Sequence, residues 1–422
     1  MGYLLLLTYS LLAPAIAALY AVFFLLSPRR SLMKALAGEL GERLGLGADS
    51  CPKGAVWIHA ASMGEVKAVA RLAPELAAAL KAPLLITSST ASGRAEGAKL
   101  GAARLAPLDF YPAAANFINT VKPRALVLVE TEIWPATLFA AARAGVPVFM
   151  VNARLSGGTL GLYKTISPLT RLAFSGVRRV LAQTAADAGR FRQLAGLADK
   201  VEETGNLKHD MLGVCASGQD KVREFLDASD WSGCPVFTAG STHPEEEPVI
   251  IDAWLEARKK VPVLKLVMVP RHPERLAETE RVLKARNAPF MRWSDHLVPE
   301  ATDCLLVDAM GLLQGFYAVS SVCFVGGTLD ATGGHNLLEP ALFSKPALFG
   351  PNYRNARHAG DTLLKAGGGF VVETAPALAE RISALLTDTA AMAEAKKKAA
   401  QALASLRGAT SKTVSSITSL LA

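Results

Sequence analysis

Short hydrophobic runs alternate with amphipathic stretches through the first half of the chain. Each run is five or six residues long and consists mainly of apolar residues, which is typical of strands buried on both faces of a sheet. The runs are 55–59, 83–87, 125–129, 146–151 and 177–182. Between them, 66–80 and 134–144 carry Ala, Val and Leu at helical spacing. Strands that alternate with helices predict βαβ units and a mostly parallel sheet.

The alternation stops between residues 206 and 233 and then resumes. The interrupted segment has no strand-like run and ends in a Ser-Gly-Cys-Pro sequence, so we expect a linker there. Further hydrophobic runs follow at 236–239, 265–269, 305–307, 322–325 and 346–348. The tail 377–422 is rich in Ala, Leu and Lys and predicts two or three helices. The fold class is therefore α/β, with two facing Rossmann-like domains, 28–205 and 234–422, that bind ligands at the carboxyl ends of their strands.

The N-terminal segment carries no charged side chain from residue 2 to residue 27. At about 1.5 Å per residue, ~20 helical apolar residues cross a hydrocarbon layer ~30 Å thick. Arg29, Arg30 and Lys34 follow directly and indicate that the C-terminal side is cytoplasmic. We therefore expect residues 1–27 to be an uncleaved membrane anchor. The alternatives are a cleaved signal peptide, which the absence of a basic start disfavours, and a helix that lies in the membrane interface.

The composition is that of a globular protein with large cores, since 51% of the 422 residues are hydrophobic and 19% are charged. The formal net charge is +8. No long Lys/Arg run or interleaved aromatic stripe accompanies this charge, so nucleic-acid binding is not indicated. A phosphorylated substrate, an anionic membrane surface or a scatter of solvated charges explains it as well. The five cysteines are widely spaced and form no CxxC pair, so neither a zinc site nor a set of disulfides is indicated. This cysteine pattern is typical of a protein in a reducing compartment.

Glu65 lies where the predicted strand 55–59 turns into the following helix. A carboxylate at such a turn is presented at the carboxyl edge of the sheet. The positive end of the helix dipole there favours its ionised form, which a general base needs. The alternative is that Glu65 only stabilises the first turn of the helix, and the pattern alone leaves both interpretations open.

Glu130 and Glu132 follow the predicted strand 125–129, with only Thr131 between them. One of two acids directly after a buried strand must point into the sheet edge or a cleft. This placement costs desolvation free energy unless a partner is present. The alternative is a helix cap made by Thr131 together with Glu132.

Two loops in the second half combine backbone amides with a cation. Gly240-Ser241-Thr242-His243 follows one predicted strand, and Pro270-Arg271-His272-Pro273 follows the next. A Gly-Ser-Thr turn offers free amides to a phosphate, and Arg271 offers a fixed positive charge. His272 alone is more often a structural hydrogen-bonding residue. The two loops together indicate an anion site.

A glycine-rich stretch follows the run 322–325. Gly326-Gly327-Thr328 is followed by Gly333-Gly334-His335-Asn336 and, three residues later, by Glu339. Glycines let the backbone approach a ligand closely. We expect a helix to begin near Asn336, with its amides facing a phosphate and Glu339 placed to accept ribose hydroxyl groups. The chain has no DxD-type metal motif in a suitable loop and no GxxxxGK[ST] motif.

In this order the motifs resemble those of the Kdo transferases, which add 3-deoxy-D-manno-oct-2-ulosonic acid (Kdo) to lipid A precursors. The matching segments span nearly the whole chain, and such an ordered series is far more specific than one motif. They are Gly41-Glu42-Arg43, Trp57-Ile58-His59, Ser62-Met63-Gly64-Glu65-Val66, Glu130-Thr131-Glu132-Ile133-Trp134-Pro135, Asn152-Ala153-Arg154-Leu155-Ser156, Gly205-Asn206-Leu207-Lys208, Ala239-Gly240-Ser241-Thr242, Pro270-Arg271-His272-Pro273-Glu274-Arg275 and Gly333-Gly334-His335-Asn336-Leu337-Leu338-Glu339-Pro340.

The resemblance implies a GT-B fold with an N-terminal membrane-anchor helix, CMP-Kdo as the donor, and neither a metal nor a further cofactor at the transfer step. It implies that Glu65 is the catalytic base and that Glu132 belongs to the acceptor side of the site. It also places the CMP pocket in the C-terminal domain. The residues expected in this pocket are Gly240, Ser241, Arg271, His272, Met310, Gly311, Gly327, Asn336 and Glu339.

The chain departs from the family pattern at two places. Many relatives have Asp-Thr-Met-Gly-Glu-Leu where this chain has Asp308-Ala309-Met310-Gly311-Leu312-Leu313. Met310 and Gly311 are kept, but ligand contacts from Leu312 are in doubt. The second departure is Ala60-Ala61, which replaces a more usual Ser-Val-type pair before the catalytic turn.

The resemblance further implies inverting transfer to the 6′ hydroxyl of lipid IVA at the cytoplasmic face of the inner membrane, without nucleic acid as a partner. Arg154 and Lys208 are candidates for binding the acceptor phosphates near the cleft. Two alternatives stay open. One is a non-catalytic, membrane-tethered nucleotide-sugar binding protein on the same fold, and the other is a GT-B enzyme that uses a UDP-sugar.

Overall fold

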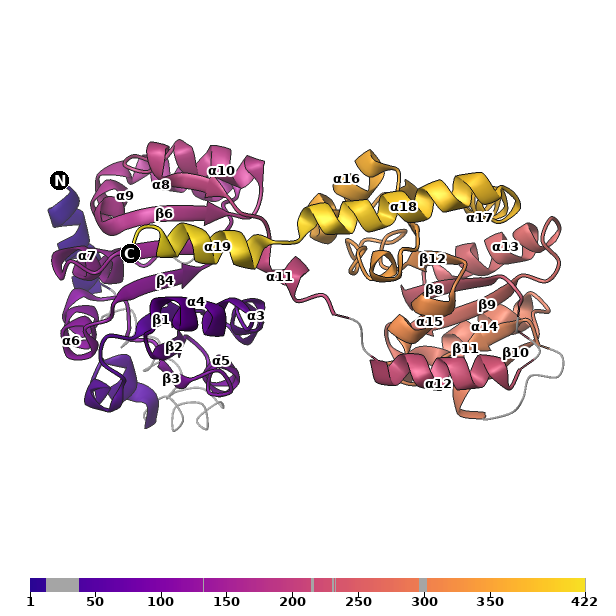
Figure 1. Cartoon of the computed structure of the whole chain (residues 1–422), viewed down its shortest axis with the longest axis horizontal. Helices are drawn as coiled ribbons and strands as arrows, with labels where there is room; N and C mark the ends of the chain where they lie inside the picture. Colours follow the sequence, from indigo (N-terminus) through magenta and orange to yellow (C-terminus); the bar gives the residue numbers. More distant parts are fainter. Residues whose placement is uncertain are drawn as a thin grey trace. The chain divides into compact units, whose positions relative to one another are not determined.

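The computed structural model describes residues 1–12, 38–131, 133–213, 216–229, 231, 233–295 and 302–421. They form two compact units, Met1–Met211 with Arg407–Ala422 and Leu212–Leu406. Each unit is built on one parallel sheet of seven strands with helices on both faces (Figure 1). The predicted architecture of two Rossmann-like α/β units is confirmed.

The sheet of the first unit has the strand order β3-β2-β1-β4-β5-β6-β7. Its strands are β1 (Val56–His59), β2 (Leu84–Ser88), β3 (Ala102–Leu105), β4 (Ala125–Val129), β5 (Val148–Ala153), β6 (Val177–Ala182) and β7 (Val201–Glu203). The chain runs outward from β1 to β3 and then returns to β4 on the other side of β1. The β1/β4 pair is therefore the topological switch point. His59 pairs with Leu128, so both strands end at the same edge.

Helices cover both faces of this sheet (Figure 1). One face carries α6 (Tyr111–Val121), α7 (Pro135–Arg143), α9 (Ser167–Ala173) and α10 (Ala185–Arg192). The other carries α3 (Met63–Ala68), α4 (Leu72–Leu80), α11 (Leu207–Asp210) and α19 (Ala409–Thr418). Two further helices are α5 (Ala91–Gly97), which packs on β2 and β3, and α8 (Gly157–Thr165), which packs on α9. The single helix predicted over 66–80 is thus two helices, α3 and α4.

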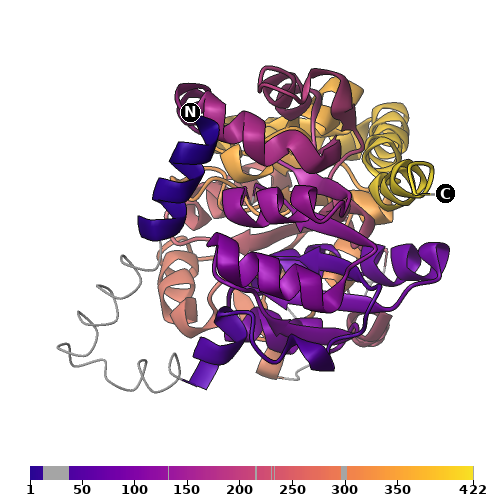
Figure 2. The ribbon, with the colours of Figure 1, turned by 90° about the vertical axis from the view of Figure 1, so that its left-hand side faces the viewer.

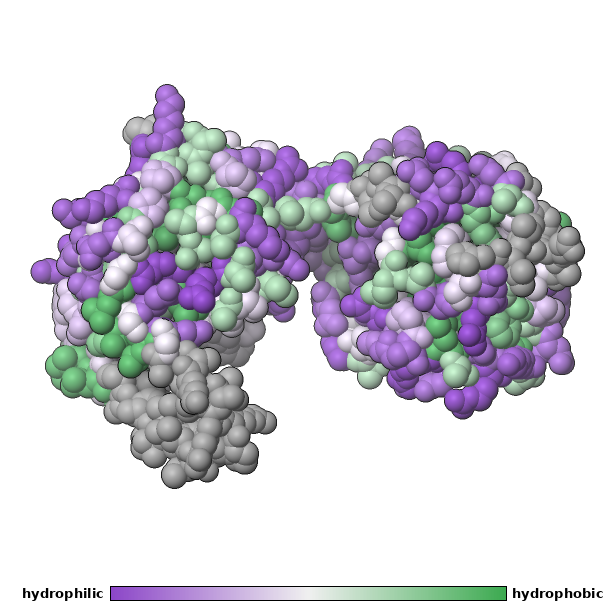
Figure 3. Space-filling model, turned by 90° about the horizontal axis from the view of Figure 1, so that it is seen from below, coloured by the Kyte–Doolittle hydropathy of each residue, from purple (hydrophilic) through white to green (hydrophobic). Residues whose placement is uncertain are grey.

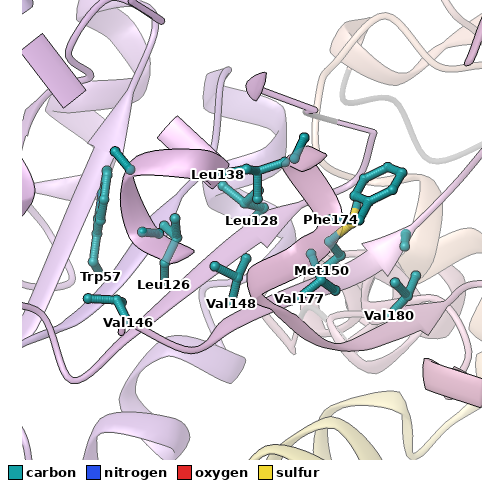
Figure 4. Packing of buried hydrophobic residues seen from close by; sticks show 14 of the residues in the cluster. Trp57, Leu126, Leu128, Leu138, Val146, Val148, Met150, Phe174, Val177 and Val180 are labelled. Carbon is teal, nitrogen blue, oxygen red and sulfur yellow. The ribbon is translucent and has the colours of Figure 1, made fainter. Parts of the chain in front are cut away.

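Side chains of successive strands form the core beneath the helices. Trp57 on β1 packs against Phe117 of α6 with ring centroids 4.9 Å apart. Leu126, Val148 and Met150 continue this core across the neighbouring strands (Figure 4). The neighbours of Trp57 on β1 point to the opposite face, because side chains alternate along a strand.

The sheet of the second unit has the order β10-β11-β9-β8-β12-β13-β14. Its strands are β8 (Val236–Thr242), β9 (Lys265–Pro270), β10 (Phe290–Arg292), β11 (Cys304–Leu306), β12 (Val322–Val325), β13 (Ala347–Phe349) and β14 (Gly369–Val371). Here the switch point lies between β8 and β12, and Val325 pairs with Gly240 at the carboxyl end of both strands.

Helices again cover both faces of the second sheet. One face carries α13 (Glu247–Arg258), α14 (Leu276–Ala285) and α17 (Ala375–Thr387). The other carries α12 (Ala216–Asp227), α15 (Leu313–Val319), α16 (Arg357–Ala366) and α18 (Thr389–Leu406).

The limits of the units differ from the predicted domains. The segment 206–233, expected to be a linker, contributes α11 to the first unit and α12 to the second. The tail forms three helices, as expected, but its last helix, α19, returns to the first unit. Ala409 and Ile417 of α19 are buried with side chains of α4. The carboxylate of Asp210 also accepts hydrogen bonds from the N–H groups of Gly408 and Thr410. The apolar face of α19 therefore packs the end of the tail against the first unit.

Residues 2–12 form a helix that packs against the first unit (Figure 2). Leu6 is buried between α7 and α9, and the Tyr9 hydroxyl donates to Asp109 at 2.8 Å. In the described part of the chain, no helix is both long enough and apolar enough to cross a membrane. The rest of the predicted anchor, 13–27, lies outside the described residues. The single-pass anchor is therefore not supported by the structure.

Candidate functional site

Each sheet collects two of the candidate motifs at one edge. Glu65 lies in α3, directly after the β1 loop, and Glu130 follows β4, while Ser241 lies at the carboxyl end of β8 and Gly327 follows β12. The carboxyl ends of parallel strands share an edge, and ligands of α/β sheets bind there at the switch point. The structure thus brings together, within each unit, motifs that are far apart in the sequence.

Glu65 lies in the first turn of α3, whose N-cap is Ser62. The Ser62 hydroxyl accepts a hydrogen bond from Glu65 N–H at 3.3 Å and donates one to Glu65 Oε1 at 3.1 Å. Ala61 N–H donates to Glu65 Oε2 at 2.8 Å. These contacts, together with the helix N-terminus, stabilise a carboxylate anion. The helix-stabilising contacts expected of Glu65 are therefore present, and they also fix the orientation of its carboxylate. Its role as a base stays a prediction.

The loop after β4 contains a strained acidic residue. Glu130 has a φ of 61°, in the left-handed region that residues other than glycine seldom adopt. Its Oε1 accepts a hydrogen bond from Lys208 Nζ at 2.9 Å. Lys208, in α11, is thus the partner that an acid in this position needs. Thr131 follows in the same loop, and Glu132 lies outside the described residues. Backbone strain of this kind is found at functional sites more often than elsewhere.

The environment of His59, the last residue of β1, was not predicted. Its Nδ1 lies 3.0 Å from the Thr87 hydroxyl, which also accepts a hydrogen bond from Trp57 Nε1 at 2.8 Å. Burial lowers the pKa of His59 to about 4, so the ring is neutral at pH 7. Within the described residues, His59 Nε2 and Trp134 Nε1 are buried without a hydrogen-bond partner. Both side chains line a cavity of about 10 Å³, and His59 therefore presents no charge to a substrate.

The carboxyl end of β8 is tightly packed. A side chain on Gly240 would clash with the hydroxyl of Tyr317 in α15, so the strand requires glycine at this position. Ser241, the next residue of the strand, has a φ of 56°. Arg271 N–H donates to Thr242 O at 3.0 Å, which joins the loop after β9 to the end of β8.

Three histidines gather at this edge of the second sheet. His243 Nε2 lies 2.8 Å from His335 Nε2, and the two rings stack with centroids 5.1 Å apart. The ring of His272 stands edge-on to His243, with centroids 6.0 Å apart. Burial, with the nearby His243 and Arg271, lowers the pKa of His335 to about 4. His243 and His335 were not among the predicted pocket residues, although both lie in the quoted motifs.

Several amides of the glycine-rich loop after β12 are occupied by protein groups. Gly327 N–H donates to the carboxylate of Glu246 at 2.7 Å, and the next two N–H groups donate to it at 3.3 Å. The N–H groups of Gly333 and Gly334 donate to Gly327 O at 3.1 and 2.6 Å. These five N–H groups are therefore not free to bind a phosphate. Sequence reasoning missed Glu246, which lies directly before α13.

The α-helix predicted to begin near Asn336 is wrong. The chain instead forms a turn followed by the 3-10 helix η6 (Pro340–Phe343), which ends at Ser344 with a φ of 55°. Asn336 Oδ1 accepts a hydrogen bond from Leu338 N–H at 3.2 Å, and Asn336 Nδ2 donates to Glu339 Oε1 at 3.4 Å. A short side chain that bonds to its own backbone two residues on competes with helix formation, which explains the difference.

Arg271 and His272 are exposed at the end of β9. Burial raises the pKa of Glu339, while the Asn336 hydrogen bond and the charge of Arg271 act in the opposite direction. Since Arg271 also acts on His335, its guanidinium is close to the loops after β12. His272 Nδ1 lies 3.2 Å from Glu274 Oε1. The predicted residues that share this edge are Gly240, Ser241, Arg271, His272, Gly327, Asn336 and Glu339.

Met310 and Gly311 lie in the loop between β11 and α15. Met310 is exposed, and Gly311 has a φ of 85° that favours glycine. A Cβ on Gly218 of α12 would lie 2.6 Å from Gly311 O, so α12 packs closely on this turn. Leu312 is buried in the core beside α12 and α15, so its side chain is part of the packing of this unit. In the described part of the chain, no hydrogen bond links Met310 to the other predicted pocket residues.

The site is not identified by a metal cluster or by cavity volume among the described residues. No group of three or more His, Cys, Asp or Glu side chains among the described residues could hold a metal ion, and metal-independent transfer stays a prediction. Two hollows of about 540 and 530 Å³ lie beside α17 and α18 and between α16 and α18. They contain none of the candidate residues, so volume alone does not identify the site.

Sequence comparison identifies relatives of this chain. Residues 38–211 match the family described as 3-Deoxy-D-manno-octulosonic-acid transferase (kdotransferase). The 3-deoxy-D-manno-octulosonic acid transferase of Haemophilus influenzae is 33% identical over 361 residues, which cover 82% of this chain and 83% of that protein. The bifunctional glycosyltransferase/methyltransferase of Fusobacterium nucleatum is 32% identical over 329 residues. These cover 75% of this chain but only 50% of that protein's length.

Structural comparison bears on the fold. A glycosyltransferase from Rickettsia africae has a TM-score of 0.56 at 14% identity, with 87% of this chain and 98% of that one covered. At this identity the likeness concerns the fold alone, which is GT-B. The identity to the Haemophilus influenzae protein extends over most of both chains and concerns the family. This chain belongs to the 3-deoxy-D-manno-octulosonic acid transferases, a family of glycosyltransferases.

Proposed function

We propose that this protein is an inverting glycosyltransferase that moves Kdo from CMP-Kdo to the 6′ hydroxyl of a lipid A precursor, lipid IVA, in lipopolysaccharide biosynthesis. Membership of the family supports Kdo transfer. One structural observation supports an acceptor side in the first unit and a donor side in the second. Each sheet gathers its candidate groups at its switch point, a held carboxylate in the first unit and cationic and polar groups in the second.

The acceptor side centres on Glu65. Its carboxylate accepts the proton of the acceptor hydroxyl while that oxygen attacks the anomeric carbon of Kdo. The bond between this carbon and the CMP phosphate oxygen breaks, and its electron pair leaves with CMP. Attack from the face opposite the leaving group inverts the configuration. Ala61 and Ser62 hold the carboxylate in one orientation, and a positioned base contributes about 10²–10⁴-fold in rate.

The donor side stabilises the leaving phosphate, which gains negative charge as the bond breaks. Arg271 supplies a permanent positive charge at the end of β9. The hydroxyl of Ser241 and the rings of His243 and His272 supply hydrogen-bond donors at the same edge. These groups replace a metal ion at the transfer step. Glu339 accepts the ribose hydroxyl groups of CMP.

The acceptor carries phosphate groups and lipid chains, so its site needs cations near a membrane. Arg154 is exposed after β5, and Lys208 is exposed in α11. Both bind acceptor phosphates in this proposal, and Glu132 completes the acceptor side. The N-terminal segment and its basic residues at 29–34 hold the protein at the inner membrane, with both units on the cytoplasmic face.

Mass spectrometry of lipid products tests the proposal. The full-length protein is incubated with lipid IVA and CMP-Kdo made in a separate reaction. We expect lipid IVA to gain the mass of Kdo, with release of CMP, and the number of added units can be read from the same spectrum. Unchanged lipid IVA in the presence of intact CMP-Kdo and folded protein would contradict Kdo transfer.

Nucleotide preference separates the proposal from its alternatives. A ligand that binds only the native state raises the melting temperature, and at equal concentration the ligand that binds more tightly raises it more. CMP should therefore stabilise the protein more than UMP or UDP at the same concentration. A larger shift with UDP would favour an enzyme that uses a UDP-sugar. A shift with CMP combined with no transfer to lipid IVA would favour a non-catalytic nucleotide-sugar binding protein.

A further inference from the structure

Glu246 is a buried acid that the proposed mechanism does not use. It is the second of three consecutive glutamates that lead from β8 into α13, and it is 0% exposed. Glu245, directly before it, is exposed. Burying a carboxylate is costly unless hydrogen bonds replace those from water. Hydrogen bonds from protein groups must therefore replace water around the carboxylate of Glu246.

Backbone N–H groups from two separate loops supply these hydrogen bonds. His243 N–H and Gly327 N–H donate to Glu246 Oε1 at 3.1 and 2.7 Å. Thr328 N–H and Leu329 N–H donate to Glu246 Oε2 at 3.3 Å each. One carboxylate thus joins the turn after β8 to the loop after β12, across the switch point of the second sheet.

The two loops lie in backbone contact around this carboxylate. A Cβ on Gly326 would clash both with Ser241 O and with Glu246 Oε1, so this close approach requires glycine. Gly326 O also accepts a hydrogen bond from His335 N–H at 3.3 Å. The side chain of His335 meets that of His243 at 2.8 Å. The position of both histidines therefore depends on the loops that Glu246 joins.

We propose that Glu246 is a positioning residue for donor binding, because its carboxylate holds the loops after β8 and β12 in the arrangement that places Ser241, His243 and His335. The identity of the donor as a CMP-sugar rests on the proposed function. Burial raises the pKa of Glu246 to about 7, although its backbone hydrogen bonds act in the opposite direction. The fold thus keeps an ionisable group where burial disfavours its charge, and no apolar residue could accept these four hydrogen bonds.

Replacement of Glu246 by glutamine tests the proposal. The amide keeps one oxygen but places an NH₂ group against two backbone N–H groups, so part of the loop loses its acceptor. Glu245→Gln removes the same charge at the adjacent exposed position and is the matched control. Glu246→Asp keeps the charge on a shorter side chain, which cannot reach both loops equally well, and should fall between the parent and Glu246→Gln.

Three readouts separate positioning from general stability. Amide hydrogen exchange of residues 326–329 should be faster in Glu246→Gln and unchanged in Glu245→Gln. The Kd of CMP and the KM of the donor should rise on the order of tenfold, since a buried donor is left unsatisfied. The KM of lipid IVA should stay within twofold of the parent value, because the acceptor groups lie in the first unit.

The outcomes distinguish this proposal from the proposed function. Parental exchange rates, or parental CMP affinity, in Glu246→Gln would overturn the positioning role. Equal changes in the KM of donor and acceptor would also overturn it, because they would indicate only a structural role. Failure of both Glu246→Gln and Glu246→Asp to fold would have the same meaning. If the parent protein does not bind CMP, the proposed function fails, and the exchange rates still decide whether Glu246 holds the two loops.

Discussion

His59 and Glu65 lie on the same strand-to-helix connection but in opposite environments. The His59 ring is enclosed, and burial lowers its pKa to about 4. Glu65 is only half-buried and accepts hydrogen bonds from Ala61 and Ser62. A general base must be accessible to the hydroxyl group whose proton it accepts. The half-buried Glu65 is accessible and the buried His59 is not, which supports Glu65 as the proposed base.

The ionisation of Glu246 should make the stability of the second unit depend on pH. Burial raises its pKa from 4.5 to about 7, so the native state holds a proton that the unfolded chain releases. The resulting stabilisation is fully present below pH 4.5, is lost as the pH rises through about 7, and is on the order of 3 kcal/mol. Between about pH 5 and pH 8, the free energy of unfolding of Glu246→Gln should therefore rise relative to that of the parent.

Urea titrations at a series of pH values measure this difference. Glu245→Gln serves as the control and should follow the parent at every pH, because Glu245 is exposed. Parallel curves for the parent and Glu246→Gln would show that Glu246 does not titrate in this range.

At the level of single residues, the sequence predicts local contacts better than distant ones. Ser62 and Glu65 are three residues apart, so their reciprocal hydrogen bonds follow from a capping pattern. Glu245 and Glu246 are neighbours and look alike in the sequence, yet only Glu246 is buried. Its burial depends on Gly327, which is 81 residues away. The sequence signal is a run of three acids, Glu245–Glu247, which two residues separate from the end of β8.

At the level of elements, the central strands were predictable and the edge strands were not. β4 and β12 match their hydrophobic runs residue for residue. The sequence analysis missed four strands, β3, β7, β10 and β14. All four are edge strands, and each has only three or four residues. An edge strand needs fewer apolar residues because one side of it lacks a neighbour. The segment Val201–Glu203 is therefore too short and too polar for its pattern to predict a strand.

The helix 2–12 should be an integral part of the first unit. The Tyr9 hydroxyl donates to Asp109, a buried carboxylate that also accepts from Thr137 N–H and from Thr137 Oγ1 at 2.8 Å each. Burial raises the pKa of Asp109, and these hydrogen bonds act in the opposite direction. Tyr9→Phe should therefore lower the free energy of unfolding by about 1–3 kcal/mol, since a hydrogen bond to a charged group is lost.

Tyr3→Phe is the matched control on the same helix. Tyr3 is 66% exposed, and its ring, which the substitution keeps, packs edge-on against Phe139. Its effect should stay within about 0.5 kcal/mol. Urea denaturation compares the two variants, and amide exchange in residues 2–12 should be faster only in Tyr9→Phe. Equal stability of the two variants would mean that the helix does not depend on Asp109.

The return of α19 to the first unit should be visible in stability. Ile417 is fully buried with side chains of α4, so Ile417→Ala should destabilise this unit by about 2–5 kcal/mol. Leu420 is 43% exposed, and Leu420→Ala should change stability by less than about 0.5 kcal/mol. Hydrogen exchange should become faster in α4 in the first variant only. Faster exchange confined to the second unit would contradict the placement of α19.

At the level of the whole molecule, the order of the units was predictable but the path of the tail was not. Two series of alternating strands and helices predict two Rossmann-like units. Nothing in the pattern of 409–418 indicates which unit its apolar face covers. The sequence also does not show that residues 2–12 pack against the first unit. This segment is uncharged and predicts a membrane helix, although Leu6 is buried in the first unit. Hydrophilic and hydrophobic residues are interspersed over much of the surface shown in Figure 3.

Transfer should not require a metal ion. The donor edge combines Arg271 with three histidines, and fixed cations and donors can stabilise a leaving phosphate. With CMP-Kdo made beforehand, the initial rate should be the same with and without EDTA. Magnesium added to the chelated enzyme is the control. Loss of activity with EDTA that magnesium restores would show that the protein groups alone do not suffice.

The rate of Kdo transfer by Glu65→Gln tests the account most directly. Glutamine keeps the shape of the side chain and cannot accept a proton at neutral pH, so kcat should fall by about 10²–10⁴-fold while the Kd of CMP stays unchanged. Glu75→Gln, which removes an exposed surface carboxylate paired with Arg71, should retain parental kcat. A kcat of Glu65→Gln within a few-fold of the parent, in a protein that transfers Kdo to lipid IVA, would contradict the assignment of Glu65 as the base.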